Sequence, residues 1–197
     1  YPFCLTGIIR NDFSNISNDK FGIINIYLAW KDNLPKEITK KIKQNNSICM
    51  ITCEPYLKEN KDLSILKDIY STNKYDALIR NFAKSINEYD HPVLLRWGHE
   101  MNGNWYSWSG MSNNQSSVSY IKAYKKIYEI FKEEKCEKVK FMFSVNSNDV
   151  PNKKWNRFEN YYPGNKYVDI IGIDMYNWGK TQKWALGHSK WTRPQDI

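Results

Sequence analysis

Short apolar runs alternate with longer amphipathic stretches along most of the chain. The apolar runs have the length and the β-branched or aromatic residues typical of strands. There are six: Phe3–Ile9, Gly22–Trp30, Ser47–Cys53, Pro92–Trp97, Val139–Val145 and Val168–Tyr176. Helical spacing of apolar residues predicts helices at Pro35–Asn45, Lys74–Tyr89 and Val118–Glu134, and a short one at Leu63–Tyr70. Apolar strands separated by amphipathic helices predict a parallel sheet covered by helices.

Polar and aromatic residues gather at the end of the predicted strands or directly after them. They are Tyr27 and Trp30, Glu54 and Tyr56, His99 and Glu100, Asn146 and Asn148, and Asp174 and Tyr176. Functional residues at the C-terminal ends of many parallel strands are typical of a (β/α)8 TIM barrel. No glycine-rich phosphate loop follows the first strand, which argues against a dinucleotide-binding fold. An α/β barrel is therefore predicted, with about six of its eight strands in this chain.

The chain of 197 residues is predicted to be one domain, residues 1–197, and to be a catalytic barrel truncated at its C-terminus. A full barrel needs about 250 residues, so two strands are expected to lie outside this chain. The complete barrel is expected to be a monomer. No run approaches the ~20 apolar residues of a membrane span and no signal peptide is visible, so no membrane partner is predicted.

The formal net charge of +8 comes mainly from lysines that cluster in the predicted helices. A solvated helix face is the simpler explanation, and an anionic partner is the alternative. No nucleic-acid motif accompanies the charge, so no nucleic-acid partner is expected. The four cysteines match no zinc spacing and are expected to be mostly buried free thiols: Cys4, Cys49, Cys53 and Cys136. No metal site and no cofactor is predicted.

The segment from Arg96 to Trp108 carries the clearest chemistry: Arg-Trp-Gly-His-Glu-Met-Asn-Gly-Asn-Trp-Tyr-Ser-Trp. An apolar strand ends there in a carboxylate, Glu100, with His, Asn, Gly and three Trp around it. A general acid for a glycosidic oxygen is a carboxyl group whose pKa is raised by partial burial or by a nearby negative charge. The structural alternative is a salt bridge between Glu100 and Arg96.

This segment resembles the acid/base motif of glycoside hydrolase family 26, in which His-Glu-Met-Asn-Gly is followed by Trp-Tyr and Trp. The resemblance extends from Ile24 to Trp178 in the same strand order. It implies a retaining, endo-acting hydrolase of β-linked polysaccharide that uses neither metal nor cofactor. The implied partner is the polysaccharide, either β-mannan or mixed-linkage β-glucan, and the implied location is secreted or at the cell surface.

The resemblance also implies roles for individual residues. Glu100 is the expected general acid/base, and His99 is expected to hydrogen-bond within the site. Trp105 is expected to stack on a sugar, or alternatively to anchor its loop. Tyr176 is expected to contact the nucleophile or the sugar at the cleavage point. Asp174 is expected to support the same site, with a structural hydrogen bond inside the barrel as the open alternative.

Two features depart from the family pattern. Retention needs a second carboxylate, and in this family it is a Glu that ends the seventh strand, so the nucleophile is expected beyond residue 197. The third strand ends in Thr-Cys-Glu-Pro-Tyr, where mannanases of the family often carry a sugar-contacting His. Glu54 at this point looks more like the branch that acts on mixed-linkage glucan, which leaves the substrate open.

The remaining predicted substrate-binding residues are those at strand ends: Glu54, Trp30 and Asn146. A hydrogen bond inside the barrel is the structural alternative for Glu54. Trp178, Trp184 and Trp191 could equally line a subsite or cover the end of the barrel.

Two other functions stay open, a non-catalytic glycan-binding barrel and a hydrolase that trims an exported microbial polysaccharide. An acidic glycan would fit the lysine excess in the latter, provided that the lysines line the cleft rather than the outer helices.

Overall fold

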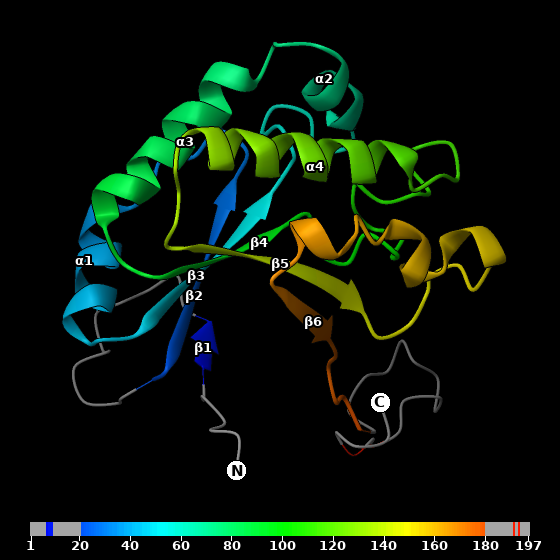
Figure 1. Ribbon diagram of the computed structural model, residues 1–197. Coiled ribbons are helices and arrows are strands. Elements are labelled where there is room, and N and C mark those ends of the chain that lie inside the picture. Colours follow the sequence, from blue (N-terminus) through cyan, green and yellow to red (C-terminus); the bar gives the residue numbers. More distant parts are fainter. Residues whose placement is uncertain (1–6, 10–20, 180–190, 192, 194–197) are drawn as a thin grey trace.

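The computed structural model describes residues 7–9, 21–179, 191 and 193. Within them, six strands form one parallel sheet in chain order: β1 (Gly7–Ile9), β2 (Ile23–Ala29), β3 (Ile48–Glu54), β4 (Val93–Trp97), β5 (Val139–Asn146) and β6 (Ile170–Asp174). The α-helices are α1 (Lys36–Gln44), α2 (Leu66–Ser71), α3 (Asp76–Tyr89) and α4 (Val118–Glu133). Three short 3₁₀ helices precede β6: η1 (Lys154–Asn156), η2 (Phe158–Tyr161) and η3 (Asn165–Tyr167). Parallel strands in chain order, with helices between them, form part of a (β/α)8 barrel (Figure 1).

The predicted strands and α-helices are confirmed in kind and order, and most ends agree within two residues. The prediction for the first strand falls partly on residues 1–6, which lie outside the described residues. The last strand is shorter than predicted at both ends. Asp169 lies just before the strand, and its carboxylate accepts the main-chain N–H of Phe141. After it, the carbonyl of Asp174 accepts the N–H of Ser147, and the chain then leaves the sheet.

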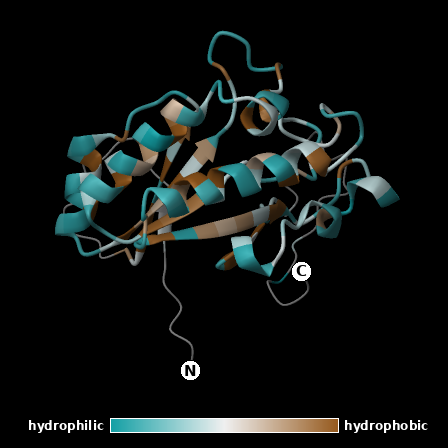
Figure 2. Ribbon diagram, turned by 45° about the horizontal axis from the view of Figure 1, so that its top comes forward, coloured by the Kyte–Doolittle hydropathy of each residue, from teal (hydrophilic) through white to brown (hydrophobic). Residues whose placement is uncertain are grey.

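The two faces of the sheet have opposite character, since side chains alternate along each strand. One face packs against the helices and forms the apolar core, with Ile24, Ile26, Leu28, Cys49, Ile51, Cys53, Val93, Leu95, Trp97, Phe141, Phe143 and Val145. In Figure 2 the strands are mainly brown and the helices mostly teal with brown residues at intervals. The other face, which is the concave inner face of the barrel, carries Asn25, Tyr27, Thr52, Arg96, Ser144 and Asp174.

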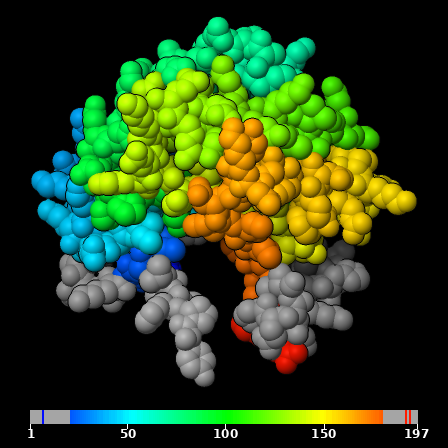
Figure 3. Space-filling model, in the orientation of Figure 1, coloured from blue at the N-terminus to red at the C-terminus, as the bar shows by residue number. Residues whose placement is uncertain are grey.

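Strand β6 is the exception on the outer face. Its outward residues Ile171 and Ile173 are 65% and 58% exposed. Figure 3 shows the molecule as an arch, with β6 (orange) on one side of a hollow and the N-terminal strands (blue) on the other. The polar inner face therefore borders this hollow.

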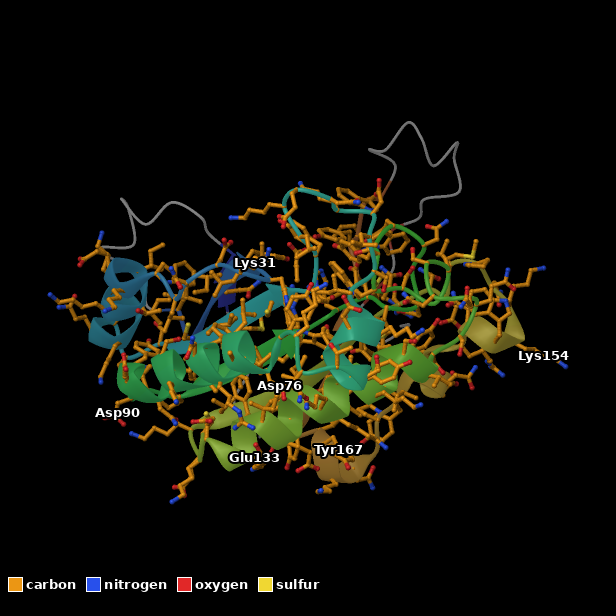
Figure 4. All side chains as sticks on the ribbon, turned by 90° about the horizontal axis from the view of Figure 1, so that it is seen from above. Lys31, Asp76, Asp90, Glu133, Lys154 and Tyr167 are labelled. Carbon is orange, nitrogen blue, oxygen red and sulfur yellow. The ribbon has the colours of Figure 1, made fainter. Side chains whose placement is uncertain are left out.

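The lysines of α1 lie on its solvated side: Lys36, Lys40, Lys41 and Lys43 are exposed. In Figure 4, Asp90 and Lys154 lie at opposite ends of the molecule. Two cations, Arg96 and Lys61, lower the pKa of Glu54. The predicted solvated lysine face is therefore present on α1.

Three cysteines that the structure describes, Cys49, Cys53 and Cys136, are buried free thiols, as expected. Burial raises the pKa of Cys49 and of Cys53 to about 12, so both are inert neutral thiols at neutral pH. Cys4 lies outside the described residues.

Candidate active site

Arg96 organises the inner face of the sheet. It is 5% exposed and its Nη1 donates to both carboxylate oxygens of Asp174, at 2.8 and 2.6 Å. Its Nε donates to Oγ1 of Thr52 at 2.9 Å, and its Nη2 donates to Oη of Tyr27 at 3.0 Å. One side chain on β4 thus ties together β2, β3 and β6. The alternative of a salt bridge from Arg96 to Glu100 does not hold, because Asp174 takes that place.

Glu100 lies just after β4 in a tight turn. Its φ is 52° and that of Gly98 is 57°, so both residues have left-handed backbone. Such a conformation is uncommon for a residue other than glycine, and it clusters at functional sites. The main-chain N–H of Glu100 donates to the carbonyl of Ser144 at 2.9 Å, which fixes the turn against β5. The turn thereby holds the Glu100 backbone next to the end of β5.

Glu100 is 8% exposed, and its carboxylate accepts the indole Nε1–H of Trp105 at 2.9 Å. Burial raises the pKa of Glu100 and the charge of Asp174 raises it further, while the Trp105 hydrogen bond, the nearby Asn146 side chain and Arg96 act in the opposite direction. The net effect is a carboxyl group that keeps its proton to a higher pH than an ordinary glutamate.

Glu54 ends β3 and is a second half-buried carboxyl group at this end of the sheet. Burial raises its pKa, and the Glu100 charge adds to this, while Arg96 and Lys61 lower it. The two glutamates are therefore electrostatic neighbours. Of the three carboxyl groups, Asp174 pairs directly with the Arg96 guanidinium, while Glu54 and Glu100 have their pKa lowered by its charge without a direct ion pair to it.

His99 is 3% exposed and lies in an aromatic cluster beside Glu100. Its Nε2 is 3.1 Å from Oη of Tyr106, whose ring stacks on Trp108 with centroids 4.1 Å apart. The Trp108 indole donates to the His99 carbonyl at 2.8 Å. Burial, with a smaller effect of Arg96, lowers the pKa of His99 to about 3. The imidazole is therefore neutral at neutral pH and can position a group by hydrogen bonding without carrying charge.

Trp105 combines a hydrogen bond to Glu100 with an open ring face, since it is 46% exposed. Gly103 makes room for this arrangement: an added β-carbon would lie 2.5 Å from Cζ2 and 2.6 Å from Cε2 of the indole. A partly exposed indole beside the carboxylate can stack on the apolar face of a sugar ring.

Tyr176 follows β6 at the edge of this region. It is 61% exposed and stacks on Trp178 with ring centroids 4.8 Å apart. It interacts electrostatically with Tyr27, which places it on the inner side of the sheet. Trp191 is 74% exposed, and Trp184 lies outside the described residues.

Trp30, which was predicted to bind substrate, does not lie with the residues around Glu100. Trp30 is 6% exposed, and its indole packs edge-on against Tyr75 and Trp97 in the apolar core between the sheet and the helices. It comes one residue after β2, where the chain turns towards α1 and the side chain is directed to the helical layer. The prediction of Trp30 as a substrate-binding residue is therefore replaced by a core role.

Other residues of the cluster were not predicted as site residues: Arg96, Tyr27, Ser144, Tyr106 and Asn102. Arg96 had a signal in the sequence, because it is the one charged residue in the apolar strand Pro92–Trp97. Tyr27 stood among the strand-end residues. Asn102 and Tyr106 lie within the quoted motif from Arg96 to Trp108, which is the signal that could have found them, whereas Ser144 has none that separates it from an ordinary strand residue.

Among the residues that the structure describes, no three His, Cys, Asp or Glu side chains are arranged to hold a metal ion. In the same residues, no helix is both long and apolar enough to cross a membrane. The groups that the structure brings together at the site are carboxyl groups, a neutral imidazole and aromatic rings.

Comparison with known proteins agrees with this geometry. Endoglucanase H of Acetivibrio thermocellus is 33% identical over 183 residues, which cover 91% of this chain and 19% of that protein. A mannan endo-1,4-beta-mannosidase of Bacillus subtilis strain 168 is 32% identical over 114 residues, which cover 52% of this chain and 29% of that protein. The chain therefore spans less than a third of the length of these two relatives.

Solved structures show the same fold. The catalytic domain of the GH26 endo-beta-1,4-mannanase of Bacillus sp. JAMB-750 superposes with a TM-score of 0.65 at 20% identity, over 84% of this chain and 50% of that one. The sequence model of glycosyl hydrolase family 26 matches residues 15–185, which is most of the chain. On this match, with the similarity to Endoglucanase H over 91% of this chain, the chain belongs to glycosyl hydrolase family 26.

Proposed function

We propose that this chain provides the acid/base side of the active site of a retaining, endo-acting hydrolase of β-linked polysaccharide. The observation that carries the proposal is the environment of Glu100, a buried carboxyl group with a raised pKa, a left-handed backbone and an indole donor. Glu100 protonates the leaving glycosidic oxygen and then activates water. Family membership supports this assignment and supports a secreted or cell-surface location.

The other predicted residues have supporting roles in this proposal. Trp105 stacks on a sugar and holds Glu100, and His99 hydrogen-bonds as a neutral imidazole. Tyr176 contacts the sugar at the cleavage point, and Glu54 accepts a sugar hydroxyl. Asn146 orients the Glu100 carboxylate.

Asp174 is a positioning residue rather than the nucleophile. Both its oxygens accept from Arg96, and Oδ2 also accepts from Oγ of Ser144 at 3.2 Å. A carboxylate whose two oxygens already accept these hydrogen bonds is a weak nucleophile towards an anomeric carbon. The nucleophile is therefore a further carboxylate beyond residue 197, at about 5–5.5 Å from Glu100 as retention requires.

The substrate is an uncharged β-glycan, such as β-mannan or mixed-linkage β-glucan. Three carboxyl groups lie at the site, and Arg96 is already paired with one of them. An acidic sugar would meet repulsion there, while the lysines of α1 lie on the outer side of the fold. This placement favours a neutral substrate over the acidic glycan of the polysaccharide-trimming alternative.

The substrate test is hydrolysis by the natural gene product of β-mannan, mixed-linkage β-glucan and, as an acidic comparison, polygalacturonate. We expect a neutral glycan to be cut into oligosaccharides of mixed length, with the β-anomer formed first in a proton NMR time course. Polygalacturonate should stay intact. Release of acidic oligosaccharides, or binding of neutral glycans without any hydrolysis, would contradict the proposal in favour of one of its alternatives.

The space over Gly103 gives a second prediction. Gly103→Ala should push the Trp105 indole away from Glu100, because the new β-carbon overlaps the ring. We expect kcat/KM on the preferred glycan to fall about tenfold, the equivalent of one lost hydrogen bond. Steady-state kinetics should show no further loss when Gly103→Ala is added to Trp105→Ala. A second, full loss in that background would mean that Gly103 acts on something other than Trp105.

A further inference from the structure

The loop after β5 is held against the turn that contains Glu100 by hydrogen bonds of one residue, Asn102, which is fully buried. Its Oδ1 accepts the main-chain N–H of Asn146 at 2.9 Å, and its Nδ2 donates to the main-chain carbonyl of Asn146 at 2.9 Å. The side-chain amide thus pairs with both backbone groups of one residue, much as a neighbouring strand does. The backbone of Asn146 is held in place by this pair of bonds.

Asn146 passes this constraint on to the carboxyl group. Its Oδ1 accepts the main-chain N–H of Asn148 at 3.0 Å, so its Nδ2 donor is the group that can stabilise the charged form of the nearby Glu100 carboxyl group, whose pKa the Asn146 side chain lowers. On its other side, Asn146 is in register with Asp174 of β6. The direction of the Asn146 amide therefore depends on a backbone that Asn102 and β6 fix from two sides.

Asn102 also holds the loop as a whole. Its side-chain Nδ2 donates to Oδ1 of Asp149 at 2.9 Å. Its main-chain carbonyl accepts from the N–H of Val150 and from Nδ2 of Asn156, both at 2.8 Å. The side-chain amide supplies an acceptor on one side and a donor on the other. Aspartate would lose the donor, and alanine would lose both.

We propose that Asn102 is a positioning residue that holds the loop after β5 against the Glu100 turn and, through the Asn146 backbone, keeps the Asn146 side chain beside the Glu100 carboxylate. This inference rests on the proposed function of Glu100. The charged groups around the pair are Asp174 on β6, Arg96 on β4, Glu54 on β3 and Asp149 in the loop. Replacing Asn102 by alanine leaves the charge of each of them unchanged.

The test is a carbon-13 NMR titration of the glutamate carboxyl groups of this chain, with the Glu100 signal assigned by its loss in Glu100→Gln. Asn102→Ala should raise the pKa of Glu100 above that of the unmodified protein, because the Asn146 side chain, which lowers this pKa, is no longer held beside the carboxyl group. Asn146→Ala should raise it equally, and the double variant should raise it no further. The control is Asn160→Ala, an exposed residue that donates to Lys154 and Trp155 carbonyls in the same loop. It should leave the Glu100 titration unchanged.

Three results would overturn the inference. Glu100 could titrate in Asn102→Ala as it does in the unmodified protein. The effects of Asn102→Ala and Asn146→Ala could add in full. Both Asn102→Ala and Asn102→Asp could fail to fold while Asn160→Ala folds, which would make the role of Asn102 structural. Since the titration needs no turnover, a gene product without hydrolase activity would reject the proposed function and leave the titration result standing.

Discussion

Glu100→Gln is expected to lower kcat on polymeric β-glycan by about 10³-fold, since a general acid–base group contributes typically 10²–10⁴-fold. Glutamine keeps the shape of the side chain, and its carbonyl oxygen can still accept the Trp105 indole N–H that Glu100 accepts at 2.9 Å. It cannot deliver a proton to the leaving oxygen. Oligosaccharide binding, measured by calorimetry on the variant, should therefore stay within about threefold of the unmodified protein, which corresponds to less than 1 kcal/mol.

A substrate with a good leaving group separates the acid role from a structural one. An aryl glycoside whose phenol leaves without protonation should form the glycosyl-enzyme at a nearly normal rate in Glu100→Gln, and its hydrolysis should then stall. Glu159→Gln is the matched control, because Glu159 is an exposed glutamate of η2, 4.0 Å from Arg157. Near-normal turnover of the polymer by Glu100→Gln would show that another group supplies the proton.

The pH dependence of this activity follows from the surroundings of Glu100. Burial, and then the charge of Asp174, raise its pKa above the ordinary glutamate value of about 4.3. The acid form needed for the first step is present below the raised pKa and is lost as the pH rises through it. The alkaline limb of kcat/KM should therefore lie above the ordinary glutamate range and be absent from the residual activity of Glu100→Gln.

The fold could be predicted because each of its strands is an apolar run of ordinary strand length between amphipathic helices. The pattern of β4 is an example, since all of Val93–Trp97 is buried as parallel strands covered on both sides require. The division into an apolar outer face and a polar inner face was less visible. Arg96 and Thr52 lie within runs that otherwise look continuously apolar, and only the register of the strands shows that they meet.

The candidate site could be predicted where local sequence determines it. Glu100, His99 and Trp105 lie within seven consecutive residues, so their proximity follows from the turn itself. The partners of Arg96 could not be predicted in this way, because Asp174 is 78 residues away along the chain. Trp30 shows the reverse error. A position just after a strand does not say whether the side chain turns to the barrel end or to the helical layer.

Arg96→Met is expected to be the most destabilising single change on the inner face. It removes a guanidinium whose side chain is 6% exposed from an aspartate that is 22% exposed, and it leaves the Asp174 carboxylate without its counterion. Removing one partner of a buried pair typically costs 3–5 kcal/mol, about 10 °C in Tm for a chain of this size. It also frees Oγ1 of Thr52 and Oη of Tyr27 from their donor. Calorimetric or circular dichroism melting of the variant at neutral pH measures the loss.

Lys126→Met provides the comparison, because Lys126 and Asp76 form a pair that is 30% and 21% exposed on α4 and α3, where Figure 4 labels Asp76. A pair of this exposure contributes about 1 kcal/mol or less, so its Tm should fall by only a few degrees. Adding Asp174→Asn to Arg96→Met should recover part of the lost stability, since the neutral amide needs no counterion. Equal losses in Arg96→Met and Lys126→Met would mean that the guanidinium does not hold the four strands together. A double variant less stable than Arg96→Met alone would mean that the Asp174 charge is stabilised by groups other than Arg96.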